Sequence, residues 1–268
     1  MEDLMKRHEK TFGCKKPIIG CLHLRALPGT PRWDPSFSMN EHIDLMLQQA
    51  HILMDLGYDA AVFANEADIP YVQTVSPAVV ACYTRIVTEV AKELTIPFGI
   101  GVLLDPYATL SIANATGACF CRGAFSLNAV SNYGEVNRNP GEIWRYAKSI
   151  GAEKIPVYTG IEAHSGTLLD TRSVEEKYLS GVVDLPIAGY IVSGPGKTPP
   201  EESVMARCKA VNPNIPIIFN NGSTPENVKG MLPYCDAVLV GTSIKRDGYL
   251  YNEIDRDRAE RFIQAAKG

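Results

Sequence analysis

Short apolar runs alternate with longer amphipathic segments from one end of the chain to the other. The apolar runs begin at residues 17–19, 59–63, 97–100, 118–121, 154–158, 187–192, 215–219 and 236–240. Most of them are almost continuously apolar, which is typical of strands in a parallel sheet that is covered on both faces. The pattern therefore predicts parallel strands that alternate with helices.

The segments between these runs carry helical periodicity and helix-start signals. Apolar residues recur at helical spacing in 39–54, 79–94 and 259–266. Helix starts that contain proline are predicted at Ser76-Pro77, at Thr198-Pro199-Pro200-Glu201, which reads as a capping box, and at Thr224-Pro225-Glu226. Each strand is thus followed by a candidate helix.

Eight such strand-and-helix units, without a repeat or a linker between them, predict a single α/β domain over residues 1–268. The favoured architecture is a closed (β/α)₈ barrel, which commonly reaches this length as one domain. A doubly wound open sheet is the alternative. No G-x-G-x-x-G motif follows the first strand, which weighs against the dinucleotide-binding form of that alternative.

Composition narrows the class of protein. The chain is 46% hydrophobic and 21% charged with a formal net charge of −4, which argues against nucleic acid as a partner. No run approaches the roughly 20 apolar residues of a membrane span, and the first residues lack a signal-peptide core. Seven cysteines without a C-x-x-C pair indicate reduced, mostly buried thiols. We expect a cytoplasmic protein, and homo-oligomerisation is left open.

The turns after the seventh and eighth predicted strands both combine glycine with hydroxyl residues. The two turns contain Asn221, Gly222, Ser223, Gly241, Thr242, Ser243, Lys245 and Asp247. Glycine lets the backbone approach an anion closely, and N–H groups at a helix start favour negative charge. Consecutive turns of this kind on the last two strands match the common phosphate site of barrels. The sequence predicts a phosphate site here, with two ordinary tight turns as the alternative.

Other predicted strand ends carry polar side chains that a packed core would not accommodate. They are His23, Asn65, Glu66, Asp105, Arg122, Glu162, His164 and Ser193. Barrel enzymes place their chemistry at these ends. The predicted catalytic residues are His23, Glu66, Asp105 and Arg122, and the predicted ligand contacts are Asn65 and Ser193. For each residue the alternative is a structural hydrogen bond or ion pair between strands.

The predicted roles follow from the chemistry of these side chains. Glu66 or Asp105 would act as the general base, His23 as a second acid or base, and Arg122 as the clamp for an oxyanion or carboxyl group.

Side chains alternate along a strand, so an inward Asp105 would bring Gly99 and Gly101 inward too and leave room above the core. An inward Arg122 would likewise bring Phe120 inward, with Cys119 and Cys121 facing outward.

Two other mechanisms are less favoured. A Schiff-base lyase needs a lysine at a strand end inside the barrel, but Lys154 starts a strand, and Lys197 and Lys245 lie in loops. No cofactor is predicted. A divalent metal bound by His23, Glu66 and Asp105 remains an alternative, although the chain has no ligand spacing such as H-E-x-x-H.

Several segments together resemble the BtpA/SgcQ family, on its SgcQ side. They are 19–29 (IGCLHLRALPG), 63–66 (FANE), 97–106 (PFGIGVLLDP), 225–228 (PENV) and 241–248 (GTSIKRDG). The resemblance implies a barrel of the ribulose-phosphate-binding kind. It implies a role in photosystem I biogenesis for BtpA itself, and a setting in sugar uptake and metabolism for the SgcQ branch. Residues 121–125 depart from the family pattern, and 126–140 match nothing familiar.

Three functions are compatible with these features. The favoured one is an enzyme that acts on a phosphorylated sugar or nucleoside-derived phosphate, as an isomerase, epimerase or lyase. The second is a non-catalytic assembly factor for a protein complex, which predicts an exposed apolar patch or a membrane-surface helix that the sequence does not show. The third is a barrel that binds a phosphorylated metabolite as a sensor.

Overall fold

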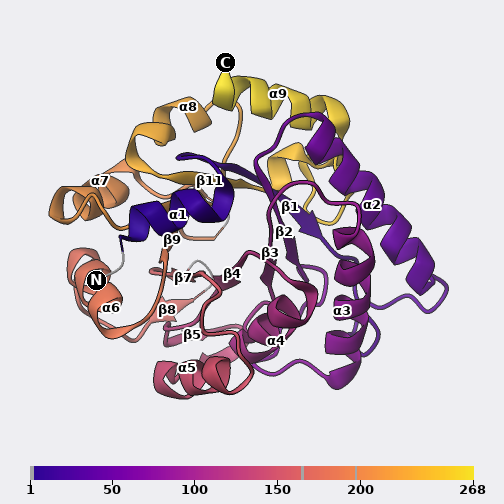
Figure 1. The fold of residues 1–268 in the computed structure, drawn as a ribbon, viewed down its shortest axis with the longest axis horizontal. Coiled ribbons are helices and arrows are strands. Elements are labelled where there is room, and N and C mark those ends of the chain that lie inside the picture. Colours follow the sequence, from indigo (N-terminus) through magenta and orange to yellow (C-terminus); the bar gives the residue numbers. More distant parts are fainter. Residues whose placement is uncertain (1–2, 164–165, 197) are drawn as a thin grey trace.

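The computed structural model describes residues 3–163, 166–196 and 198–268. Its centre is a closed barrel of parallel strands in the order β1-β11-β10-β9-β7-β4-β3-β2 (Figure 1). The strands are β1 (Ile18–His23), β2 (Ala60–Ala64), β3 (Phe98–Gly101), β4 (Phe120–Gly123), β7 (Val157–Gly160), β9 (Gly189–Ser193), β10 (Ile217–Asn220) and β11 (Ala237–Val240). Each overlaps its predicted apolar run, so the barrel prediction is confirmed.

Helices surround the barrel in Figure 1. They are α2 (Met39–Asp55), α3 (Pro77–Ala91), α4 (Pro106–Thr116), α5 (Pro140–Ser149), α6 (Val174–Asp184), α7 (Glu202–Val211), α8 (Val228–Met231) and α9 (Arg256–Lys267). Short 3₁₀ turns η1 (Leu232–Tyr234), η2 (Thr242–Ile244) and η3 (Arg246–Gly248) flank β11. No helix in the described part of the chain is long and apolar enough to cross a membrane.

The proline-containing helix starts have different outcomes. Ser76 caps α3 as predicted, and its side chain accepts a hydrogen bond from the Val79 amide. The capping box predicted at Thr198 is wrong, because α7 begins only at Glu202 and the Thr198 hydroxyl donates to the Pro195 carbonyl over 2.7 Å. Consecutive prolines keep the preceding residues extended, which delays the helix. The start predicted at Thr224 is also displaced, since α8 begins at Val228 without a side-chain cap.

The core has two layers. Inside the barrel, Phe120 packs with Tyr158, Ile19 and other inward residues, whereas Cys121 belongs to the layer between strands and helices. A Cβ atom on Gly99 would lie only 2.4 Å from the Phe120 ring, so Gly99 also faces inward. The predicted alternation along β3 and β4 is therefore correct.

A helix that the sequence pattern did not predict covers the N-terminal end of the barrel (Figure 1). This helix is α1 (Leu4–Phe12), and only His8 and Phe12 among its residues are buried. The Phe12 ring lies 5.0 Å from the Phe120 ring inside the barrel. His8 is hydrogen-bonded through Nδ1 to the Tyr158 hydroxyl (3.0 Å) and through Nε2 to the Asp236 carbonyl (3.2 Å).

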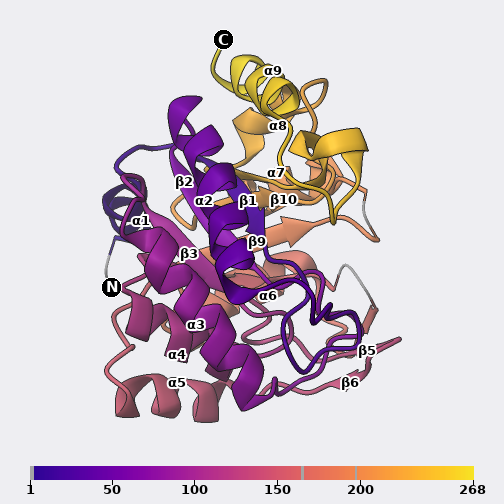
Figure 2. The ribbon, with the colours of Figure 1, turned by 90° about the vertical axis from the view of Figure 1, so that its right-hand side faces the viewer.

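A small antiparallel sheet lies on the opposite side of the molecule from α1, as Figure 2 shows. Its strands are β6 (Gly134–Val136), β5 (Ala129–Ser131) and β8 (Thr167–Leu168), in that order. They come from the segments that follow β4 and β7. The unassigned loop of the sequence thus folds into a hairpin at the C-terminal end of the barrel.

Candidate active site

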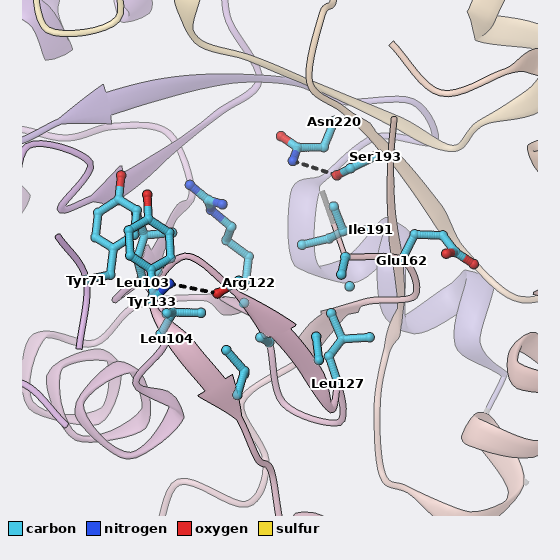
Figure 3. A pocket seen from close by; sticks show the side chains of 18 of the residues that line it. Tyr71, Leu103, Leu104, Arg122, Leu127, Tyr133, Glu162, Ile191, Ser193 and Asn220 are labelled. Atoms are coloured by element: carbon cyan, nitrogen blue, oxygen red, sulfur yellow. Dashed lines mark hydrogen bonds between the residues drawn. The ribbon is translucent and has the colours of Figure 1, made fainter. Parts of the chain in front are cut away.

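A cavity of about 130 Å³ lies where the barrel strands end, beside the small sheet. Its lining comes from the ends of β3, β4, β7, β9 and β10, from the segments after β2 and β4, and from the hairpin. The lining includes Glu66, Tyr71, Leu103, Leu104, Arg122, Leu127, Ala129, Tyr133, Val136, Glu162, Ile191, Ser193 and Asn220 (Figure 3). Three of the predicted site residues, Glu66, Arg122 and Ser193, therefore share one cavity.

The centre of this cavity is an ion pair. Arg122 Nη2 lies 3.3 Å from Glu66 Oε1, and the two side chains are only 9% and 18% exposed. The Tyr71 hydroxyl donates to the Glu66 carbonyl (2.9 Å) and reaches Glu66 Oε2 (3.2 Å). Arg122 Nε is buried without a hydrogen-bond partner in the described part of the chain. A carboxylate and a guanidinium are thus held together, and the Arg122 Nε–H group is still able to donate a hydrogen bond.

His23 lies at the end of β1, next to the turn after β11. A Cβ atom on Gly241 would lie 2.9 Å from His23 Cε1, so glycine there allows the ring to approach. Burial lowers the pKa of His23 to about 3, helped by the Lys245 and Arg122 cations and opposed by Glu66. The ring is therefore neutral near pH 7, and its Nδ1 has no hydrogen-bond partner among the described residues.

Lys245 was predicted to bind phosphate, but the structure gives it another role. Its side chain is fully buried, and Nζ donates to Gln49 Oε1 of α2 over 2.9 Å. Burial lowers the pKa of Lys245 to about 8. Lys154 lies at the end of the barrel covered by α1, since its carbonyl accepts a hydrogen bond from Arg7. Lys197 and His164 lie outside the described residues.

Two further predicted site residues are used to hold the backbone. Asp105 caps α4, where Oδ1 accepts from the Ala108 amide (2.9 Å) and Oδ2 from the Val75 amide (2.8 Å). Asn65 is 1% exposed and accepts a hydrogen bond from the Leu103 amide (2.8 Å). Neither side chain lines the cavity. The expectation that Asp105 is a base and Asn65 a ligand contact is therefore corrected.

The alternative in which His23, Glu66 and Asp105 bind a metal is not supported by the described residues. In residues 3–163, 166–196 and 198–268 there is no group of three or more His, Cys, Asp or Glu side chains that could hold a metal ion. His23 and Glu66 lie close enough to influence one another, whereas Asp105 is occupied by two backbone amides.

The two glycine turns contact each other through their hydroxyl groups. Ser223 Oγ donates to the Leu239 carbonyl (3.0 Å), and Ser243 Oγ donates to the Ser223 carbonyl (2.6 Å). Gly222 has φ 63°, and a side chain there would collide with the Pro199 backbone. These hydroxyls therefore fix the shape of the turns.

The backbone amides of these turns differ from the hydroxyl groups in their hydrogen bonding. The amides of Gly222, Ser223, Thr242 and Ser243 have no hydrogen-bond partner within the described residues. Asn220, which lines the cavity, directly precedes the first turn, whereas these four residues are not themselves part of the cavity lining. The second turn leads into the 3₁₀ turn η2, not into an α-helix as expected. Asp247 is exposed further along, at φ 59°.

The sequence reasoning missed part of the lining. Asn220 Nδ2 donates to Ser193 Oγ over 3.0 Å, and Figure 3 shows this pair on the far side of Arg122 from two tyrosines, Tyr71 and Tyr133. Asn220 carried a signal, because it directly follows the apolar run 215–219. Tyr133 carried none, because its hairpin is too short for a periodic pattern. Glu162, one of the polar strand-end residues that received no predicted role, also lines the cavity, and its carboxylate pairs with Lys177 of α6 at 2.9 Å.

Comparison with known proteins gives matches along most of the chain. The BtpA family profile matches residues 14–268. The sgc region protein SgcQ of Escherichia coli K12 is 32% identical over 257 residues, which cover 96% of each chain. The photosystem I biogenesis protein BtpA of Synechocystis is 29% identical and covers 96% of this chain and 90% of its own.

Among solved structures, phosphoribosylanthranilate isomerase from Thermotoga maritima superposes with a TM-score of 0.58. The match covers 94% of this chain and 99% of that one, at 15% sequence identity. At this identity the match shows the barrel fold alone.

Proposed function

This chain belongs to the BtpA family, and we propose that it is an enzyme acting on a phosphorylated sugar or a nucleoside-derived phosphate. The reaction is of the isomerase, epimerase or lyase type. The phosphate is held by the backbone amides of the turns after β10 and β11. The observation that carries the proposal is a buried carboxylate–guanidinium pair in a cavity whose lining residue Asn220 leads directly into the first turn with unpartnered amides.

Glu66 and Arg122 divide the chemistry between them in this proposal. Glu66 accepts a proton from the substrate, since Asp105 is occupied by backbone amides. Arg122 stabilises the oxyanion that develops, in a site shielded from water where such an interaction is strong. His23 does not line the cavity, and it is a neutral imidazole, because its pKa of about 3 prevents it from carrying charge near pH 7.

The phosphate supplies binding energy away from the reacting carbon. Four neighbouring amides can each donate to a phosphate oxygen without a charged side chain. Lys245 does not take part, because Gln49 holds its ammonium. The named activity of the solved isomerase, on a phosphoribosyl compound, is consistent with a phosphate ligand for this fold.

Two variants at one exposed residue test the phosphate site. Thr242→Glu places a carboxylate beside the amides, and Thr242→Gln is its uncharged match. With ribose 5-phosphate as the probe in isothermal titration calorimetry, we expect Thr242→Glu to weaken binding about tenfold by charge repulsion. Thr242→Gln should change it less than threefold.

Equal affinities for the two variants would refute the phosphate site. Binding of the probe without turnover of any phosphorylated compound would favour the metabolite sensor. Failure of every phosphorylated compound to bind would leave the assembly factor, the role that the Synechocystis relative's name describes.

A further inference from the structure

The cavity has an aromatic side. Tyr71 follows β2 and Tyr133 lies in the hairpin between β5 and β6, and their ring centroids are 5.0 Å apart at 56°. Figure 3 shows the two rings side by side with both hydroxyls directed the same way. The hydrogen bond from the Tyr71 hydroxyl to the Glu66 carbonyl fixes one ring. The Tyr133 amide donates to Ser131 Oγ over 3.1 Å, which fixes the turn that carries the other.

The wall next to the tyrosines is apolar. It is formed by Leu103, Leu104, Leu127, Ala129 and Val136. Leu104 adopts φ 59°, and its carbonyl accepts a hydrogen bond from the buried Arg138 guanidinium. Arg138 also donates to the Ala124 carbonyl (3.1 Å) and to Gln73 Oε1 (2.9 Å). A buried arginine thus holds this wall in a fixed shape before any ligand arrives.

The opposite side of the cavity is polar. Ser193 and Asn220 are hydrogen-bonded there, and Asn220 directly precedes the turn that contains Gly222 and Ser223. Figure 3 places the Arg122 guanidinium between this pair and the two tyrosines. The cavity therefore runs from the polar Ser193–Asn220 side, past the Glu66–Arg122 pair, to an aromatic and apolar side.

We propose that the substrate carries a planar unsaturated ring at the end opposite its phosphate, as a nucleotide or an aryl-substituted sugar phosphate does. This inference rests on the proposed function, because it takes the phosphate to lie at the turns. A plain sugar phosphate would place hydroxyl groups against the apolar wall, where they would lose hydrogen bonds to water. A flat ring instead stacks on Tyr71 and Tyr133, and stacking of a base on an aromatic side chain strengthens binding about tenfold or more.

The small sheet determines this specificity. Tyr133, Ala129 and Val136 all come from the hairpin inserted after β4, whereas Arg122 stands on β4 and Glu66 follows the end of β2. The hairpin thus supplies one tyrosine and part of the apolar wall separately from the reacting pair, whereas Tyr71 shares the segment after β2 with Glu66. A change in the hairpin can alter which ring is accepted without moving the base.

Calorimetry with four probes tests the inference: adenosine 5′-monophosphate, uridine 5′-monophosphate, ribose 5-phosphate and inorganic phosphate. We expect at least one nucleotide to bind tenfold or more tightly than ribose 5-phosphate. Tyr133→Ala should abolish this preference, Tyr133→Phe should keep it, and Asn132→Ala serves as the neighbouring control. Circular dichroism and the melting temperature verify that each variant is folded.

Two outcomes separate this inference from the proposed function. If ribose 5-phosphate binds as tightly as both nucleotides and Thr242→Glu still weakens it, the phosphate site stands and the ring site is refuted. If Thr242→Glu changes nothing, or no probe binds, the proposed function fails and this inference fails with it. A nucleotide preference that survives Tyr133→Ala would also refute the tyrosine wall.

Discussion

Both ends of the barrel bury a histidine, but the two ends differ in whether the buried polar atoms have hydrogen-bond partners. At the N-terminal end His8 has partners for both ring nitrogens, Tyr158 and the Asp236 carbonyl. At the C-terminal end His23 has an Nδ1 atom without a partner in the described part of the chain, and Arg122 Nε is in the same state. Burying polar atoms without partners is costly, so a folded protein rarely keeps several of them in one place.

This difference separates a structural cluster from a site. The cluster under α1 is complete, because its aromatic rings and hydrogen bonds fill the space between the helix and the strands. The cluster at the other end retains a cavity, unpartnered donors and a carboxylate beside a guanidinium. Ligand atoms can supply the missing partners there. We therefore call the C-terminal end the open end and the N-terminal end under α1 the closed end. A variant at each end tests this difference.

The largest expected effect is at the open end. Glu66→Gln removes the proposed base and keeps the size of the side chain. Turnover of a phosphorylated substrate should fall about 10²- to 10⁴-fold, the usual contribution of a general base. The melting temperature should change little, because Tyr71 also bonds the Glu66 backbone carbonyl. Steady-state kinetics and thermal unfolding measure the two quantities, and unchanged turnover would remove Glu66 from the mechanism.

The closed end should show the reverse behaviour. Phe12→Ala removes a ring that is 4% exposed and packs against Phe120 and Tyr158. Urea unfolding should show a loss of about 3–5 kcal/mol, as for other buried Phe-to-Ala changes. Ligand affinity at low temperature should stay within about twofold. Val183→Ala, at a side chain that is 73% exposed, is the control and should cost less than about 0.5 kcal/mol.

A loss below about 1 kcal/mol for Phe12→Ala would show that α1 contributes little to the closure of the barrel. A large loss of ligand affinity would show that the two ends are coupled, which the separation of their contacts does not predict.

The sequence predicted the barrel because each strand is an apolar run covered on both faces. Such a run can be recognised in the sequence without knowing which strands it pairs with. It did not predict α1, since only His8 and Phe12 of that helix are buried and most of its other residues, apart from Leu4 and Met5, are polar. The small sheet was missed for a similar reason. Its strands have two or three residues each, too few for an alternating pattern to be seen.

The site was predicted only in part, because a strand-end polar residue does not reveal its partner. Glu66 and Arg122 face the cavity, whereas Asp105 and Lys245 are satisfied by the Val75 amide and by Gln49. The sequence did contain a signal that Asp105 caps a helix. It is followed by proline, the same cap-and-proline signal that correctly placed the start of α3. Lys245 carried no such signal, since Gln49 is almost two hundred positions away.

The smallest expected effect concerns the neutral state of His23. Its pKa is lowered from 6.5 to about 3 in the folded protein, so between these values the unfolded chain binds a proton that the folded chain does not. Stability therefore falls as the pH falls through this window, by up to about 1.4 kcal/mol per pH unit from this residue. His23→Gln removes that contribution, so wild type should lose about 2 kcal/mol more than the variant between roughly pH 6 and pH 4. Urea unfolding at both values measures the difference. Parallel pH profiles would mean that the His23 ring takes up a proton in the folded state. His23 would then be a buried cation at the C-terminal end of the barrel, whereas His8 at the other end is hydrogen-bonded through both ring nitrogens.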